Sequence, residues 1–308
     1  MWSQQSRVLW LKHGDNNTKF FHFRASKRHR RNLICGIKDE SYAQQVQSEA
    51  IASVLIRYYQ DVFATSNPNP HMVFFDHIPI VITNDMNATL TRTFLESKIV
   101  TALKQMAPLK APSPDKMPPL FYRHFWGLVD NDVTSSILSW LNSGTLRHPL
   151  NHTFITLIPK TKNPELVQEY RPISLCNVFY KIFSKVLANR LKKSLPLIIT
   201  EHQFAFTKNR LITDNILVAF ELPHCMKNQV SRDIGFMATK LDMSKAYDRV
   251  KWVCLENIMR KMGFSEKWIE LIMVYVKTVT YFILVNGEPQ GLIHPWGTSI
   301  SFLLPPVH

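Results

Sequence analysis

Two carboxylates, Asp242 and Asp248, lie in the segment LDMSKAYD at Leu241–Asp248. The residues before them, IGFMATKLDM, predict a strand that ends near Asp242, and Ser244 is suited to begin a helix. A carboxylate at a strand end, beside the free N–H groups of a helix start, can bind a divalent ion and a phosphate together. Spacing alone favours the simpler interpretation, an exposed Asp that caps a helix, because two-metal phosphoryl transfer needs several acids from different segments.

The charge of the chain indicates a polyanionic partner. Lys and Arg total 37 against 23 acidic residues, which gives a net charge of +14 and a pI near 9.7. Nucleic acid is the partner favoured by such an excess, while an anionic membrane or a basic surface without a partner remain alternatives. Residues 7–38 are strongly basic and contain Phe20, Phe21 and Phe23. This pattern fits single-stranded nucleic acid, and fits equally well a solvated helix that packs on a core.

Composition places the chain among globular proteins. It has 308 residues, of which 45% are apolar, and no stretch reaches the roughly 18–20 apolar residues of a membrane span. The first residues lack a secretory signal. The cysteines Cys35, Cys176, Cys225 and Cys254 show no metal-ligand spacing, so we expect reduced thiols, no disulfide partner, no membrane and an intracellular location, in nucleus or cytoplasm.

Hydrophobic periodicity and turn residues predict both helices and strands. Helices are expected at 49–63, 96–106, 121–141, 174–195, from Ser244 to Gly263, and after Ser265. Strands are expected at 153–158, 234–243 and 281–285, the last leading into an Asn286-Gly287 hairpin turn. A linker is expected at 66–84 and a proline-rich loop at 110–119.

Several long segments resemble the reverse transcriptases of LINE-type (non-LTR) retrotransposons, especially those abundant in plant genomes. They include LDMSKAYDRVKW, Ile158-Pro159-Lys160, Tyr170–Lys192, HGDNNTKFFH (His13–His22), KAPSPDKMPP (Lys110–Pro119), QFAFTKNRLITDNI (Gln203–Ile216), MGFSEKWIELIM and NGEPQG. The segments follow the order of that family and extend to Gly291. The resemblance implies an RNA-directed DNA polymerase that acts by two-metal nucleotidyl transfer.

The resemblance also implies an α+β fold, a partial right-hand polymerase with fingers and an incomplete palm. Residues 1–84 would be a basic helical connector, 85–233 the fingers region, and 234–308 the incomplete palm with an aberrant tail. An RNA template, a DNA primer and dNTP would be the partners.

Family roles transfer onto matching positions. Asp242 would be the catalytic palm aspartate and a ligand of Mg²⁺, of which the intact family uses two ions. Lys160 and Arg171 would grip the triphosphate, a task suited to a point charge and a planar fork. Tyr247 would be the steric gate against a ribonucleotide. Gln203 and Arg210 would support the template, and Asp248 fits a structural role better than direct metal binding.

The chain departs from the family pattern after Gly291. The expected P-x-R-G-L-R-Q-G-D-P-L-S-P segment does not follow, nor does the Y-A-D-D segment with the remaining palm carboxylates. We therefore expect the purified chain not to polymerise, and a basic nucleic-acid-binding remnant without catalysis is the alternative function. Ser113 and Lys116 occupy positions where the family has glycines; a side chain there costs about 1 kcal/mol if φ is positive.

Overall fold

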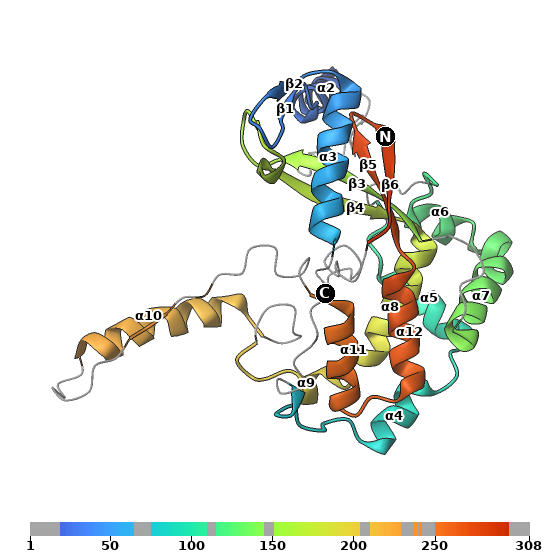
Figure 1. Cartoon of the computed structure of the whole chain (residues 1–308). Coiled ribbons are helices and arrows are strands. Elements are labelled where there is room, and N and C mark those ends of the chain that lie inside the picture. The colour runs from blue at the N-terminus through green and yellow to red at the C-terminus, as the bar shows by residue number, and fades with distance from the viewer. Residues whose placement is uncertain are drawn as a thin grey trace.

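The computed structural model describes residues 19–64, 75–109, 115–144, 151–203, 210–228, 237–239, 241 and 250–295. A four-stranded sheet occupies one end of the molecule, and most of the helices lie below it (Figure 1). The helices are α2 (Lys19–Asn32), α3 (Ser48–Phe63), α4 (Asn84–Thr91), α5 (Glu96–Gln105), α6 (Pro119–His124), α7 (Trp126–Ser143), α8 (Val178–Leu191), α9 (Leu195–Ile198), α10 (Ile212–Asn228), α11 (Trp252–Lys261) and α12 (Glu266–Lys277).

The sheet combines strands from distant parts of the chain. Its order is β4 (Tyr170–Cys176), β3 (His152–Pro159), β5 (Thr280–Val285), β6 (Glu288–Ile293). The pairs β3–β4 and β5–β6 are antiparallel, whereas β3 and β5 are parallel, with Ile155 opposite Ile283. The sheet is therefore mixed. A separate short hairpin joins β1 (Ile37–Lys38) to β2 (Gln44–Gln45).

The two faces of the sheet differ in burial. Alternate residues on β3 and β5, such as Ile155 and Tyr281, are fully buried, and α3 covers this face where the rings of Phe63 and Tyr281 lie 5.1 Å apart. The residues at the alternate positions of the same two strands, such as Phe154 and Phe282, point to the opposite face and are half-buried. On that second face, which we call the open face, Ile173 is 42% and Leu292 46% exposed. The described residues therefore bury only one side of the sheet.

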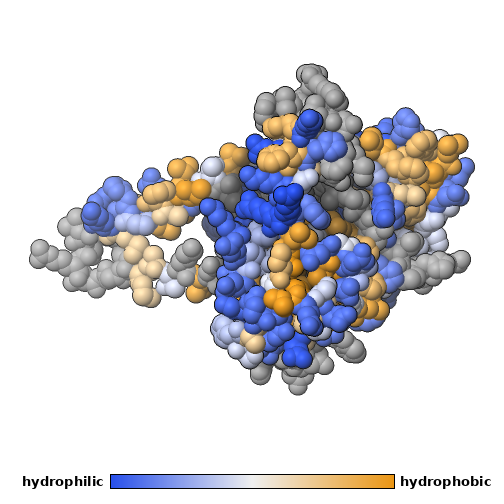
Figure 2. Space-filling model, turned by 90° about the horizontal axis from the view of Figure 1, so that it is seen from above, coloured by the Kyte–Doolittle hydropathy of each residue, from blue (hydrophilic) through white to orange (hydrophobic). Residues whose placement is uncertain are grey.

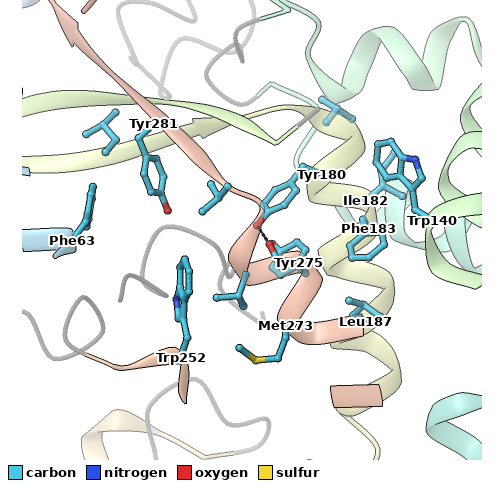
Figure 3. Close-up of a cluster of buried hydrophobic side chains, with 14 of the residues drawn as sticks. Phe63, Trp140, Tyr180, Ile182, Phe183, Leu187, Trp252, Met273, Tyr275 and Tyr281 are labelled. Carbon is cyan, nitrogen blue, oxygen red and sulfur yellow. Dashed lines mark hydrogen bonds between the residues drawn. The ribbon is translucent and has the colours of Figure 1, made fainter. Parts of the chain in front are cut away.

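An aromatic cluster below the sheet joins α8 to α12 (Figure 3). The rings of Tyr180 and Tyr275 stack with centroids 4.3 Å apart, and Phe183 stacks on Tyr275 at 5.5 Å. The Tyr180 hydroxyl donates to the backbone carbonyl of Tyr275 at 3.2 Å. Burial raises the pKa of Tyr180 well above its ordinary value, so this donor keeps its proton.

Helix α10 protrudes from the rest of the molecule (Figures 1 and 2), with apolar and polar residues side by side along it. Its exposed apolar residues include Leu217 and Phe220, which are 62% and 74% exposed. Among the described residues, none of the buried core cluster comes from α10. No helix in the described ranges has the length and apolar character needed to cross a membrane.

Most of the expected elements are confirmed. Helices α3, α5 and α12, strands β3 and β5, and the Asn286-Gly287 turn lie where the sequence predicts them, and Gly263 ends α11 with φ +90°. The coarse α+β class is also confirmed, since helices accompany a mixed sheet. The division at residues 84 and 233 remains a prediction. The strand at 234–243 and residues 244–249 fall largely outside the described residues.

Three helix predictions are wrong in part. The helix expected from Ser244 to Gly263 begins only at Trp252 as α11, because Val250 is not helical and Lys251 has the extended geometry of an N-cap (φ −78°, ψ 134°). Residues 174–176 belong to β4 rather than to the helix expected at 174–195, because Ser174 lies opposite Ile155 in the ladder with β3. The single helix expected at 121–141 is two helices, α6 and α7, interrupted at Phe125. Phe125 has φ −99° and ψ 21°, which departs from α-helical geometry.

Lys116 has φ +58°, a left-handed backbone conformation that disfavours any side chain with a Cβ. The strain expected at this position is therefore present, whereas Ser113 lies outside the described residues. We predict that Lys116→Gly raises the free energy of unfolding by about 0.5–1 kcal/mol, measured by urea denaturation. Lys116→Ala is the matched control, because it removes the charge but keeps the strain. Equal stabilisation by both variants would contradict the prediction.

Candidate functional site

The β3–β4 hairpin brings Lys160 and Arg171 together. The backbone N–H of Lys160 donates to the carbonyl of Glu169 at 2.8 Å, which continues the ladder one pair beyond Pro159. Arg171 lies opposite Ile158. Because side chains two residues apart share a face, Lys160 and Arg171 are diagonal neighbours on the open face, about 7–8 Å apart at their Cα atoms. Both residues are exposed.

Hydrogen bonds hold the loop of this hairpin. Glu169 accepts from the backbone N–H groups of Glu165 at 2.6 Å and Leu166 at 3.1 Å. These two bonds hold the pKa of the Glu169 carboxyl below its ordinary value of 4.5. The ammonium of Lys160 donates to the carbonyl of Gln168 at 2.6 Å. This hydrogen bond joins the Lys160 side chain, at the start of the loop, to the backbone near its end.

A second contact ties the hairpin loop to the N-terminal part of the chain. The backbone N–H of Lys38 in β1 donates to the carbonyl of Glu165 at 2.8 Å, and the two side chains form an ion pair. The loop is therefore supported from within by Glu169 and from outside by β1.

Apolar residues of the open face continue from the cationic end. Phe154 and Phe282 meet edge to face at 6.0 Å, and Ile173 and Ile158 lie on the same face between this pair and the cationic end. The prediction of functional residues missed this surface. The signal was present, however, because TFITLI has apolar residues in both alternating phases, Ile155 and Leu157 in one and Phe154 and Ile158 in the other. This pattern is typical of strands covered on both faces. A positively charged end beside an apolar surface can accommodate a ligand with a phosphate group and a flat ring.

The remaining predicted site residues divide into two groups. Arg210 donates from Nη1 to the backbone carbonyl of Gln203 at 2.6 Å, so these two residues are close to each other, in the segment between α9 and α10. In Figure 1, α9 lies at the end of the molecule opposite the sheet. Asp242, Tyr247 and Asp248 lie outside the described residues.

The described residues contain no cluster of three or more His, Cys, Asp or Glu side chains placed to hold a metal ion. The predicted Mg²⁺ ligand, Asp242, falls outside those residues. The Mg²⁺ site therefore remains a prediction that rests on the resemblance of LDMSKAYD.

Comparison with known proteins gives consistent matches. Residues 158–296 match the family of reverse transcriptases (RNA-dependent DNA polymerases). The "Transposon TX1 uncharacterized 149 kDa protein" of Xenopus laevis is 24% identical over 284 residues, which is 92% of this chain and 21% of that protein. The "Retrovirus-related Pol polyprotein from type-2 retrotransposable element R2DM" of Drosophila melanogaster is 27% identical over 163 residues, 53% of this chain and 15% of that protein.

A further relative is the "Probable RNA-directed DNA polymerase from transposon BS" of Drosophila melanogaster. It is 27% identical over 161 residues, 45% of this chain and 16% of that protein. The chain thus spans between 15% and 21% of the length of these relatives.

Replacement of Glu169 should loosen the hairpin loop. We predict that Glu169→Ala increases the rate of tryptic cleavage after Lys160 and Lys162, because the N–H groups of Glu165 and Leu166 lose their acceptor. Mass spectrometry of timed digests measures the cleavage. Since the folded pKa of Glu169 is depressed, its contribution is present above pH 4.5 and is lost as the pH falls through the lower folded value. Glu270→Ala, an exposed change on α12, is the control and should leave the rate unchanged.

Proposed function

Because the chain belongs to the reverse transcriptases of LINE-type (non-LTR) retrotransposons, we propose that it is part of an RNA-directed DNA polymerase whose β3–β4 hairpin binds the incoming dNTP. The observation that supports this role most directly is the placement of Lys160 and Arg171 as exposed diagonal neighbours on one face. RNA template and DNA primer are the proposed partners. The strands β3 and β4 are proposed to belong to the fingers of a partial right-hand polymerase.

The chemistry of the two cations suits a triphosphate. Lys160 supplies a compact charge on a flexible stem, and Arg171 supplies a planar fork that can bind two phosphate oxygens at once. The Lys160 ammonium donates one hydrogen bond to the Gln168 carbonyl in this structure. An ammonium has two further protons that it can donate to a phosphate. The apolar residues of the open face can contact the flat part of a nucleotide.

The other predicted residues enter this proposal through the resemblance. Asp242 would bind Mg²⁺, which neutralises charge on the triphosphate when it is bound. Tyr247 would exclude ribonucleotides, and Gln203 and Arg210 would support the template. The mutual contact of Gln203 and Arg210 is consistent with one shared role, because the arginine orders the backbone that carries the glutamine.

We predict that Lys160→Ala and Arg171→Lys each weaken binding of a fluorescent dNTP in Mg²⁺ buffer about tenfold, measured by fluorescence anisotropy. A hydrogen bond to a charged group contributes about 1.5–3 kcal/mol, and 1.4 kcal/mol is tenfold in affinity. Arg171→Lys keeps the charge but removes the fork. A primed RNA whose next template base is A should strengthen binding of dTTP above that of the other dNTPs.

Lys162→Ala is the matched control, since Lys162 is an exposed lysine two residues further along the same loop. Equal losses for Lys160→Ala and Lys162→Ala would show that charge alone matters, and would contradict the proposed site. The second candidate function, a basic nucleic-acid-binding module without catalysis, is favoured by the charge of α2. It predicts binding of RNA without binding of dNTP, whereas the proposed polymerase binds both.

A further inference from the structure

Helix α2 is the most strongly basic element among the described residues. Its sequence KFFHFRASKRHRRN holds six Lys or Arg residues and no acidic residue over 14 positions. Three of its basic side chains, His29, Arg30 and Arg31, lie in the last turn, where positive charge complements the helix dipole. The charges of the last turn therefore stabilise the end of the helix and also make its surface electropositive.

The cations are not distributed at random around α2. Ala25 is 8% exposed and faces the body of the molecule, where α2 contacts β3. On the outward side, Phe23, Lys27 and Arg30 recur at helical spacing of four and three residues and form one exposed stripe. Lys19 and Arg31 flank this stripe and are also exposed. In the view onto this end of the molecule, hydrophilic and hydrophobic residues lie side by side at the centre (Figure 2).

An aromatic ring lies within the stripe. Phe23 is 65% exposed, although burial of a phenylalanine is strongly favoured by the hydrophobic effect. A second ring, Phe20, already lies under the guanidinium of Arg24 at 5.4 Å. Exposed rings among cations are typical of surfaces that bind single strands, in which bases stack while cations follow the phosphates.

The C-terminal end of α2 is attached to the sheet. Asn286, in the β5–β6 turn, accepts from the N–H of Ile34 at 2.8 Å and donates to the carbonyl of Ile34 at 3.0 Å. Lys38 pairs with Glu165 of the β3–β4 loop, as described above. The stripe is therefore held in place before any partner binds, which lowers the entropic cost of binding.

We propose that the outward stripe of α2, formed by Lys19, Phe23, Lys27, Arg30 and Arg31, binds a single strand of RNA. The cations contact successive phosphates along a helix about 21 Å long, and a base stacks on Phe23. The surface is separate from the proposed dNTP site, because it includes neither Lys160 nor Arg171. It gives the chain a contact with RNA in addition to the template contact proposed for Gln203 and Arg210.

A membrane surface fits the same stripe less well. Helices that lie in a membrane interface bury a continuous apolar face among the lipid chains. Among the side chains of α2 that the structure describes, Phe23 is the one large apolar residue that is mostly exposed, and cations surround it. A strand of RNA matches this alternation of one ring and several charges.

The test measures binding of the full chain to a labelled, unstructured oligouridine by fluorescence anisotropy over a series of salt concentrations. The triple variant Lys27→Gln/Arg30→Gln/Arg31→Gln should weaken binding at least tenfold at low salt. It should also lower the slope of log affinity against log salt by about 2, since each lost phosphate contact contributes about 0.7. Phe23→Ala should weaken binding about fivefold or more with an unchanged slope.

The control triple Lys98→Gln/Lys104→Gln/Lys267→Gln removes the same charge from exposed lysines of α5 and α12 and should have less than a twofold effect. Lys160→Ala/Arg171→Ala should also leave binding within twofold, which separates this surface from the dNTP site. Phe23 is exposed, so its replacement reports on binding rather than folding, and circular dichroism checks α2 in the triple variant.

Three results would overturn the proposal. Equal losses of affinity in the two triple variants would show a general charge effect. Unchanged binding in Phe23→Ala would contradict the proposed stacking of a base on Phe23. The third is tighter binding to phosphatidylserine vesicles than to the oligouridine, with loss in Phe23→Ala, which would assign the stripe to a membrane surface.

Discussion

Asn151, buried at the start of β3, connects that strand to the segment between α12 and β5. Its side-chain amide donates to the hydroxyl of Thr278 at 2.7 Å, and its backbone carbonyl accepts from the N–H of Thr280 at 3.2 Å. These bonds begin the parallel pairing of β3 with β5, two strands whose first residues are 128 positions apart. This register joins the β3–β4 and β5–β6 hairpins into one sheet. The hairpin with Lys160 and Arg171 lies on one side of the pair, and the turn with Asn286 lies on the other.

The aromatic stack below the sheet gives this arrangement its rigidity. Helix α8 follows β4 and α12 precedes β5, so the contact of Tyr180 with Tyr275 joins the two halves of the sheet a second time. Close-packed rings resist small shifts, since interiors have the density of organic crystals. The proposed phosphate-binding residues and the basic stripe of α2 are thus placed by one core, to which residues from the beginning, middle and end of the described chain contribute.

The sequence predicted the elements whose signals are local. The Asn286-Gly287 turn, the capping Ser265 and the apolar spacing of α3 each depend on a few neighbouring residues, and each was found in its expected place. Residues 174–176 were assigned to a helix because the pairing of Ser174 with Ile155 depends on a strand elsewhere in the chain. Among the site residues, Lys160 and Arg171 could be named from the resemblance, but their common face required the register. The open face was missed because apolar residues in a strand indicate burial, whichever partner provides it.

The attachment of Ile34 to Asn286 joins residues that are 252 positions apart. During synthesis on the ribosome, α2 leaves the exit tunnel long before the turn that holds its end in place. At about 5–20 residues per second, the delay is on the order of 10–50 seconds. For that interval the basic helix lacks its contact with Asn286, while it lies close to the RNA that encodes it. The order of synthesis therefore presents the charged surface of α2 to a nearby transcript before the fold is complete.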